Sequence, residues 1–267
     1  MIYILCLIAA AVIILLLHYE NTELSVSYFT VSSEKLEKDL ITAQISDFHN
    51  THNTVLQNSI ISSLKENRPD CIFVTGDLID SRRTDIECAV AFARKLTEIA
   101  PVYYVVGNHE IRSSQYKKIM EAFEKTDMII MHDTSILTEG LNLVGLDDLY
   151  TVPYSERSAL FTERYQKLKD DSRFNLVLFH RPELFDTYCD NEIDLILCGH
   201  AHGGQFRLPI IGAVLSPNQG LFPVYTENLY SKGKTKMIVS RGIGNSLFPF
   251  RLNNKPELIY IKLEKKL

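Results

Sequence analysis

The sequence lacks the excess of basic residues that nucleic-acid-binding proteins usually carry. Its 28 lysines and arginines are outnumbered by 33 aspartates and glutamates, which gives a net charge of −5. The isoelectric point lies near 5.9. Because a basic face is the usual electrostatic footprint of DNA or RNA binding, no nucleic-acid partner is expected.

Cysteine is also too sparse and too scattered to build a disulfide framework or a zinc ribbon, since the five residues show no such spacing. The chain contains no internal repeat, no low-complexity stretch and no linker rich in Pro, Gly or Ser. With 267 residues, 46% hydrophobic and 23% charged, the composition is that of an ordinary globular protein with a sizeable core. We therefore expect one globular domain.

One long apolar run is present, at the N-terminus. Residues 2–17 are uninterrupted apolar, and at ~1.5 Å per residue they span roughly 24 Å, near the lower limit for crossing a ~30 Å hydrocarbon core. No basic stretch precedes the run, and no small-x-small cleavage site follows it. The sequence thus predicts an uncleaved transmembrane anchor over residues 1–19 and a globular domain over residues 20–267. A buried N-terminal helix or strand is the alternative.

The predicted anchor makes the chain a single-pass membrane protein, and two features bear on the side that the domain occupies. Glu20 and Glu23 follow the apolar run, and the first lysine is Lys35. This charge distribution favours a domain outside the cytoplasm. Cys71 and Cys198 lie in predicted core strands, and buried free thiols favour a reducing compartment. Both orientations stay open.

Apolar runs of strand type alternate with helical patterns along most of the chain, and short β runs with Pro and Gly follow residue 206. This order predicts an α/β domain in which two sheets face each other. The expected strands are residues 24–31, 40–46, 71–75, 102–106, 128–131, 141–145, 175–179, 194–198, 236–240 and 257–263. The expected helices are residues 59–66, 86–99, 115–125 and 156–169.

Histidines and acidic residues gather where the predicted strands end. The carboxyl ends of strands form the edge at which layered α/β proteins assemble their sites. Carboxylate and amide oxygens mixed with imidazoles, including one carboxylate able to bridge, suit a pair of divalent ions better than one structural zinc. The candidate metal ligands are Asp47, His49, Asp77, Asn108, His180, His200 and His202.

Each of these residues, taken alone, has a simpler structural explanation. Asp77 suits the N-cap of a helix, His180 suits a core position, and the pair His200 and His202 suits an exposed turn. Their joint occurrence at strand ends and in glycine turns favours a metal site, because a motif gains force when its predicted structural context also fits.

In chain order the clusters read D-x-H from residue 47, G-D-x-x-D from residue 76, G-N-H-E from residue 107, a single His180, and G-H-x-H from residue 199. The chain resembles the calcineurin-like metallophosphoesterase family, whose full signature covers residues 47–202. Residues 203–209 and 240–244 resemble a bacterial branch with an N-terminal membrane anchor or export signal. The resemblance implies a four-layer α/β/β/α sandwich with metals at the strand ends, here with an N-terminal membrane helix.

The resemblance also implies two ion sites that share Asp77. One site consists of Asp47, His49, Asp77 and His202, and the other of Asp77, Asn108, His180 and His200. His109 is then a catalytic residue and not a ligand, which protonates the leaving oxygen or stabilises its charge. Asp80 hydrogen-bonds His109 and sets its tautomer. The ions are Mn, Fe, Zn or Co, because this mixed ligand set accepts each of them.

The activity implied is that of a dinuclear metal-dependent phosphohydrolase. Because of the expected membrane anchor, a lipid-linked phosphodiester or pyrophosphate is the expected substrate class, with UDP-2,3-diacylglucosamine as a candidate. A soluble nucleotide or a cyclic diester is the alternative substrate. A metal-bound binding protein without turnover is a further alternative, although it would need no oriented acid such as the pair His109 and Asp80.

Residues outside the clusters have two explanations each. Asp147 and Asp148 follow a short strand and either border the cleft or cap the next turn. The aromatic-rich stretches 221–225 and 247–250 either form an apolar lip for an acyl chain or pack the C-terminal β region. Three more side chains either contact a substrate phosphate or form contacts within the fold, namely Gln205, Arg207 and Arg241.

Overall fold

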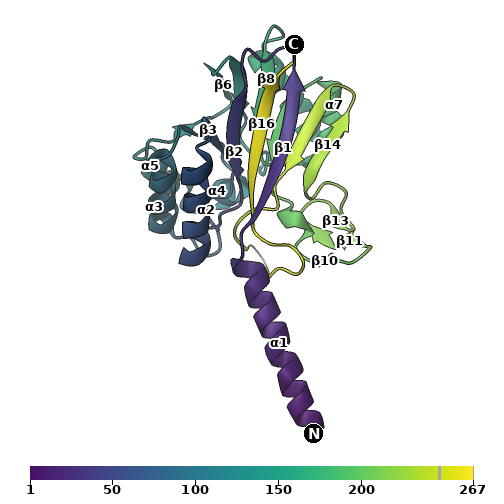
Figure 1. Cartoon of the computed structure of the whole chain (residues 1–267). Helices are drawn as coiled ribbons and strands as arrows, with labels where there is room; N and C mark the ends of the chain where they lie inside the picture. The colour runs from purple at the N-terminus through teal and green to yellow at the C-terminus, as the bar shows by residue number, and fades with distance from the viewer. Residues whose placement is uncertain (246–247, 267) are drawn as a thin grey trace.

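The computed structural model describes residues 1–245 and 248–266, without the side chains of residues 9, 10 and 13. Two six-stranded sheets lie face to face in it (Figure 1). The first sheet has the order β1 (Ser25–Ser33), β16 (Glu257–Lys265), β2 (Leu40–Ile45), β3 (Cys71–Val74), β4 (Val102–Tyr104), β5 (Ile129–Ile130). The second has the order β14 (Asn228–Lys232), β15 (Thr235–Val239), β9 (Leu195–Cys198), β8 (Phe174–Leu178), β7 (Leu141–Gly145), β6 (Thr134–Thr138).

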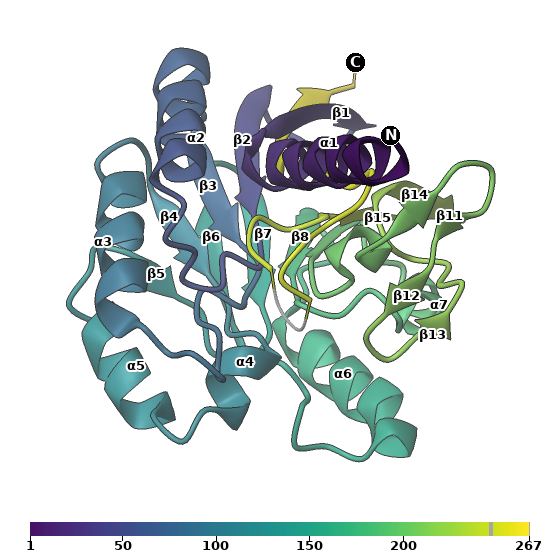
Figure 2. The same ribbon diagram turned by 90° about the horizontal axis from the view of Figure 1, so that it is seen from below.

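Helices cover the outer face of each sheet (Figure 2). The first sheet is covered by α2 (Thr54–Asn67), α3 (Ile86–Thr97) and α5 (Tyr116–Phe123), and the second by α6 (Tyr154–Leu168) and α7 (Phe185–Asp190). A short α4 (Asn108–Arg112), a 3-10 turn η1 (His202–Gly204) and the hairpins β10 (Arg207–Leu208)–β11 (Gly212–Ala213) and β12 (Leu215–Ser216)–β13 (Gly220–Leu221) complete the domain. The predicted α/β class with two facing sheets is confirmed.

Strands β3 and β9 are buried on both faces, which is why they are apolar at every position. In β3, Ile72 and Val74 contact the helices, whereas Cys71 and Phe73 pack against the other sheet. Parallel strands covered on both faces normally have such continuous apolar sequences. Full burial of a side chain such as Phe73 contributes about 1.5–3 kcal/mol to the free energy of folding.

Strand direction places the candidate site. In the first sheet β2, β3, β4 and β5 run parallel, and in the second β7, β8, β9 and β15 run parallel. The carboxyl ends within each parallel set therefore share one edge, and the loops that carry the predicted ligands leave the strands there. Helices α2 and α3, which follow the loops after β2 and β3, begin at side-chain caps. Asn53 accepts from the N–H of Leu56, and Asp85 accepts from the N–H of Cys88, both at 3.0 Å.

Local chemistry accounts for the differences from the predicted elements. Helix α2 begins at Thr54, five residues before the predicted start, because Asn53 caps it there. Strands β6 and β14 were not predicted; they are edge strands whose residues are partly or fully exposed, so they lack the strong apolar pattern of a core strand. All five cysteines are free thiols, as their spacing indicated.

Helix α1 (Ile2–Thr22) corrects the predicted membrane anchor. It points away from the domain (Figure 1). Most of its large apolar side chains are exposed. Within the residues that the structure describes, no helix combines the length and the apolar character needed to cross a bilayer. The prediction of a single-pass membrane protein is therefore wrong. The apolar run spans only roughly 24 Å, and the polar residues after it continue the same helix.

The last turn of α1 contacts the segment that supports the candidate site. Glu20 Oε2 accepts from the N–H of Asn254 at 3.0 Å, and Asn21 Oδ1 accepts from the N–H of Arg251 at 3.1 Å. The fully buried Arg251 guanidinium then donates to the carbonyls of Arg241 at 2.7 Å and Gly244 at 2.6 Å. Arg251 thus ties residues 241–244 to the part of the segment that contacts α1.

We expect Arg251→Met to lower the free energy of unfolding by about 2–4 kcal/mol, because it leaves buried carbonyl acceptors without a donor. Urea denaturation followed by circular dichroism measures the change. Arg94→Met, which alters an exposed arginine on α3, is the matched control and should change stability by less than about 0.5 kcal/mol. Equal stability of the two variants would contradict the supporting role of Arg251.

Candidate metal centre

Loops after β2, β3, β4, β8 and β9 bring the predicted ligands together. Asp47, His49 and His202 form one buried cluster, and the ligand atoms of its members lie within 4.8 Å of one another. Asp77, His180 and His200 form a second buried cluster by the same measure. Asn108, the remaining candidate, begins α4 and lines the same cleft as Asp77 and both C-terminal histidines.

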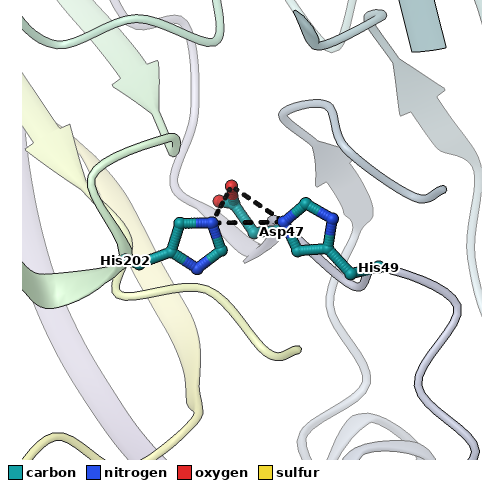
Figure 3. A group of neighbouring side chains, drawn as sticks. All are labelled: Asp47, His49 and His202. Carbon is teal, nitrogen blue, oxygen red and sulfur yellow. Dashed lines mark hydrogen bonds and ion pairs between the residues drawn. The ribbon is translucent and has the colours of Figure 1, made fainter. Parts of the chain in front are cut away.

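The first cluster has two imidazole nitrogens beside one carboxylate (Figure 3). His49 Nε2 lies 3.1 Å from His202 Nε2, and His202 Nε2 lies 3.4 Å from Asp47 Oδ1. The Nδ1–H group of His49 donates to the carbonyl of Ile79 at 3.2 Å. The proton of His49 is therefore on Nδ1, and the lone pair of Nε2 faces the cluster.

The second cluster repeats this arrangement. The Nδ1–H group of His180 donates to the carbonyl of Thr75 at 2.7 Å, and the Nε2–H group of His200 donates to Asn218 Oδ1 at 3.0 Å. Their other nitrogens, His180 Nε2 and His200 Nδ1, are 3.2 Å apart. Two lone pairs at this separation repel unless a cation or a proton lies between them. The donor set therefore fits a metal ion.

Asp77 links the two clusters through a single carboxylate oxygen. Its Oδ2 lies 3.2 Å from His180 Nε2 and 3.8 Å from His49 Nε2. Its Oδ1 accepts from the backbone N–H of His109 at 2.8 Å, which fixes the carboxylate plane. Nearby, Asn108 Oδ1 is buried without a hydrogen-bond partner among the described residues. An unmet buried acceptor next to a bridging carboxylate suits cation binding.

The backbone at this site is strained. Left-handed φ angles are uncommon for residues other than glycine and cost about 1–3 kcal/mol each, and they concentrate at functional sites. Five of the predicted ligands adopt them, namely Asp47 (52°), His49 (47°), Asp77 (54°), His200 (66°) and His202 (48°). The surrounding fold holds these turns in place, which indicates that the strained backbone serves to point the ligand side chains into the site.

The histidines of the metal-free site differ in their pKa values because their surroundings differ in charge. Burial lowers the pKa of His180, but the carboxylates of Asp77 and Asp47 outweigh it and raise that pKa to about 10. Burial, together with His109, lowers the pKa of His49 to about 3. Burial opposes ionisation of Asp77, yet the neighbouring imidazoles, His180 first, hold its pKa well below the ordinary value. A proton on His180 thus pairs with Asp77 in the absence of metal.

Glu110 has a structural role that the sequence reasoning missed. Its buried carboxylate accepts from the backbone N–H groups of Asp77 at 3.0 Å, Ile79 at 2.9 Å and Gly107 at 2.8 Å. It therefore ties the loop after β3 to the loop after β4. The signature itself contained this residue, but only the structure shows that it binds backbone and not metal.

His109 lies beside the two clusters that Asp77 links, but it belongs to neither of them. Its Nδ1 is 3.3 Å from Asp80 Oδ1, and the backbone N–H of Ser81 approaches the same nitrogen at 3.1 Å. The Arg112 guanidinium, also missed from sequence, contacts both ring nitrogens. The proximity of Asp80 agrees with the predicted pair, while its influence on the tautomer stays a prediction because Ser81 competes for the nitrogen.

A cleft of about 370 Å³ opens beside these residues. Its wall is part cationic, with Arg82, Arg112, Arg157 and Arg181, and part apolar, with Tyr150, Leu215, Pro217 and Phe248. Gln205 lines it as well. Leu247, at the start of the second predicted aromatic lip, lies outside the described residues, and Leu221 and Phe222 of the first are exposed.

The remaining polar residues form contacts within the fold. Arg207 and Arg241 both pair with Glu227, and Arg241 also lies 3.2 Å from Glu257. Asp148 pairs with Arg181 at 2.7 Å, and Asp147 lies 2.9 Å from His132. Among the described residues, the side chains of both aspartates have these partners and form no capping hydrogen bond with the backbone of the next turn.

Comparison with known proteins adds independent findings. Residues 41–204 match the family model described as calcineurin-like phosphoesterase. The chain is 31% identical over 230 residues to the uncharacterized metallophosphoesterase YkuE of Bacillus subtilis, covering 83% of this chain and 78% of that one. It is 27% identical over 205 residues to the phosphodiesterase YaeI of Escherichia coli, covering 74% and 72%. Its fold is similar to the crystal structure of TT1561 of Thermus thermophilus, with a TM-score of 0.52, 14% identity and coverage of 76% and 90%.

Gly107→Ala should weaken Mn²⁺ binding at least about tenfold, because a Cβ atom at this position would lie 2.2 Å from Asp77 Oδ1 and displace the shared carboxylate. Isothermal titration calorimetry on the chelated and dialysed protein measures the affinity. Gly233→Ala is the control, since a Cβ there meets nothing within 4 Å. Wild-type affinity in Gly107→Ala would show that Asp77 does not hold the ion.

Metal binding should release a proton from His180 near pH 8. The pKa of His180 is raised to about 10 in the folded chain, so its imidazolium stabilises the metal-free fold. This stabilisation is complete below a pH of about 6.5, the ordinary pKa of histidine, and is lost as the pH rises through about 10. Mn²⁺ affinity should therefore increase with pH between about 7 and 9. Titrations in buffers of different ionisation enthalpy count the protons, and a count of zero would contradict the assignment.

Proposed function

The chain belongs to the calcineurin-like phosphoesterase family, whose members are hydrolases acting on phosphoric esters, and we propose that the bond it cleaves is a phosphodiester or a pyrophosphate. The observation that carries this proposal is the shared carboxylate. Asp77 Oδ2 lies within 3.8 Å of imidazole nitrogens from both ligand clusters, as a dinuclear centre requires. The family uses a dinuclear metal centre, and the two clusters are candidate sites for it.

In this proposal Asp47, His49 and His202 hold one ion, while Asn108, His180 and His200 hold the other, and Asp77 contributes to both. When bound, such an ion pair lowers the pKa of a water molecule and offsets the charge of the phosphoryl oxygens. The chain supplies lone pairs already aimed at the site, because Ile79, Thr75 and Asn218 accept the protons of three imidazoles on their far sides. Little reorganisation is then needed on binding.

His109 has the role of general acid in this proposal. Its Nε2 lies 4.0 Å from Asp77 Oδ2, so the imidazole is next to the place where phosphate oxygens would lie, although it belongs to neither ligand set. Transfer of a proton from His109 to the leaving oxygen, or stabilisation of its charge, accounts for about 10²–10⁴-fold in rate. Either Asp80 or the N–H of Ser81 orients the ring through Nδ1, since both lie within reach of that nitrogen, and Arg112 adds a positive charge beside the ring.

The substrate class is proposed from the cleft. The sequence favoured a lipid-linked substrate chiefly because of the expected membrane anchor, and that support falls away with the anchor. The apolar wall of Tyr150, Leu215 and Phe248 is the support that remains for a substrate with an apolar or aromatic portion. An acyl chain and a nucleoside base both match this wall, so lipid-linked diesters and soluble nucleotides are the two classes to compare. The phosphodiesterase YaeI among the relatives supports a diester bond.

The first experiment is hydrolysis of bis(p-nitrophenyl) phosphate and p-nitrophenyl phosphate by the full chain, with Mn²⁺ added back after chelation. We expect restored turnover with preference for the diester. His109→Ala should lower kcat by about 10²–10⁴-fold while keeping metal stoichiometry, because the backbone N–H that positions Asp77 is retained.

His132→Ala removes a histidine that pairs with Asp147 away from the ligand clusters and serves as the matched control, with turnover close to wild type. Loss of metal in His109→Ala would assign that residue as a ligand. Binding of two ions without turnover of either ester, or of natural nucleotides and lipids, would replace the hydrolase proposal by a binding function.

A further inference from the structure

One arginine in the cleft lacks a full set of partners. Arg157, near the start of α6, lines the cleft with His200 and His202, yet only 7% of its surface is exposed. Its Nε–H group donates to the carbonyl of Val152 at 3.0 Å, and Nη2 reaches the carbonyl of Tyr150 at 3.5 Å. Nη1 is buried with no hydrogen-bond partner in the part of the chain that the structure describes. A buried charged donor without an acceptor costs free energy, so an acceptor from a bound molecule is expected.

The neighbouring arginine, by contrast, has carboxylate partners. Arg181 lies 2.7 Å from Asp148 and 3.1 Å from Glu183 through its Nε and Nη1 atoms. Both carboxylates act on the charge of Arg157, but Arg181 occupies them. Within the described residues, no ion pair of 4.0 Å or less includes Arg157. The cleft wall therefore has one guanidinium paired with carboxylates and one, that of Arg157, whose described partners are two backbone carbonyls and the ring of Tyr154, 5.6 Å away.

Guanidinium chemistry identifies the missing acceptor. The group stays charged at all physiological pH values, and its planar fork of donors matches the oxygens of a phosphate bidentately. Arg157 lies on α6, which covers the second sheet, whereas His109 and Arg112 lie on α4, which follows β4 of the first sheet. Arg157 lines the same cleft but is none of the residues assigned to the metals or to the leaving group.

We propose that Arg157 binds a second phosphate of the substrate, one that is not hydrolysed. The inference rests on the proposed phosphodiesterase function and narrows its substrate class to a phosphodiester or pyrophosphate that carries a further phosphate. Tyr150 and Phe248, on the same cleft wall, supply apolar contacts for the rest of such a molecule. Arg157 is in this sense a specificity-determining residue, and it takes no part in bond cleavage.

The test uses two esters that differ by one phosphate, thymidine 5′-(p-nitrophenyl phosphate) with and without a 3′-phosphate. Both release p-nitrophenol, so the ratio of their kcat/KM values on one Mn²⁺-loaded preparation is independent of the active fraction. We expect the wild-type chain to prefer the 3′-phosphorylated ester at least about tenfold. Arg157→Met should bring the ratio to within about twofold of unity. Arg164→Met, on the same helix and paired with Asp133, should keep the wild-type ratio.

A wild-type ratio near unity would overturn the inference and leave the phosphodiesterase proposal intact, since both esters would still be cleaved. Cleavage of neither ester would count against the phosphodiesterase proposal instead. Binding then decides the inference: thymidine 3′,5′-bisphosphate should bind the Mn²⁺-loaded chain at least about tenfold more tightly than thymidine 5′-monophosphate. Equal binding of the two nucleotides would overturn it.

A second variant covers the case in which Arg157→Met does not fold. Arg157→Lys keeps the aliphatic stem and the charge but loses the planar fork, so it should reduce the preference for the second phosphate without abolishing it. An Arg157→Lys ratio equal to that of the wild type would show that the fork does not bind phosphate and would refute the inference.

Discussion

The architecture depends on keeping one buried carboxylate, that of Asp77, at the junction of two sheets. Its Oδ1 is held by the backbone N–H of His109, which belongs to the next loop of the first sheet, and its Oδ2 faces His180 from the second sheet. Glu110 holds the backbone around it through three N–H groups. A charge buried in this way is tolerated only when opposite charge and hydrogen bonds surround it. Protonated His180 from the second sheet supplies that charge in the metal-free chain, and the proposed ions supply it when they are bound.

This requirement explains why the site is both strained and buried. Left-handed backbone at Asp47, His200 and His202 turns the side chains inward immediately after strands that must stay straight and apolar. Hydrogen bonds from the C-terminal segment stabilise those turns; for example, the N–H of Gly244 donates to the carbonyl of Asp47 at 2.7 Å, and Asn254 donates to the carbonyl of His202 at 2.7 Å. Strain at a functional site is normally offset by surrounding structure in this way. The segment after residue 240 is therefore part of the site, although it contributes none of the proposed ligands.

The sequence predicted those parts of the structure that have a distinct residue pattern. Strands such as β3 and β9 are buried on both faces and are apolar at every position, and the loops after them could be located for that reason. Edge strands β6 and β14 leave a weaker signal. Asn218 could not be found, because it reaches His200 from a hairpin whose path is set by tertiary packing. The apolar run at the N-terminus predicted a helix correctly and its environment wrongly, since length and composition alone do not separate these outcomes.

The position of β16 has a consequence for the order in which the chain can become active. This strand is the last in sequence, yet it lies between β1 and β2 in the first sheet, parallel to one and antiparallel to the other. A ribosome that has released the motifs up to residue 202 has therefore not yet released the strand that joins β1 to the sheet. Contacts of such large sequence separation are slow to form, because the intervening loop must close first. The nascent chain thus exposes an incomplete sheet edge until residues 257–265 have left the ribosome, and the complete first sheet that supports the site can form only after that.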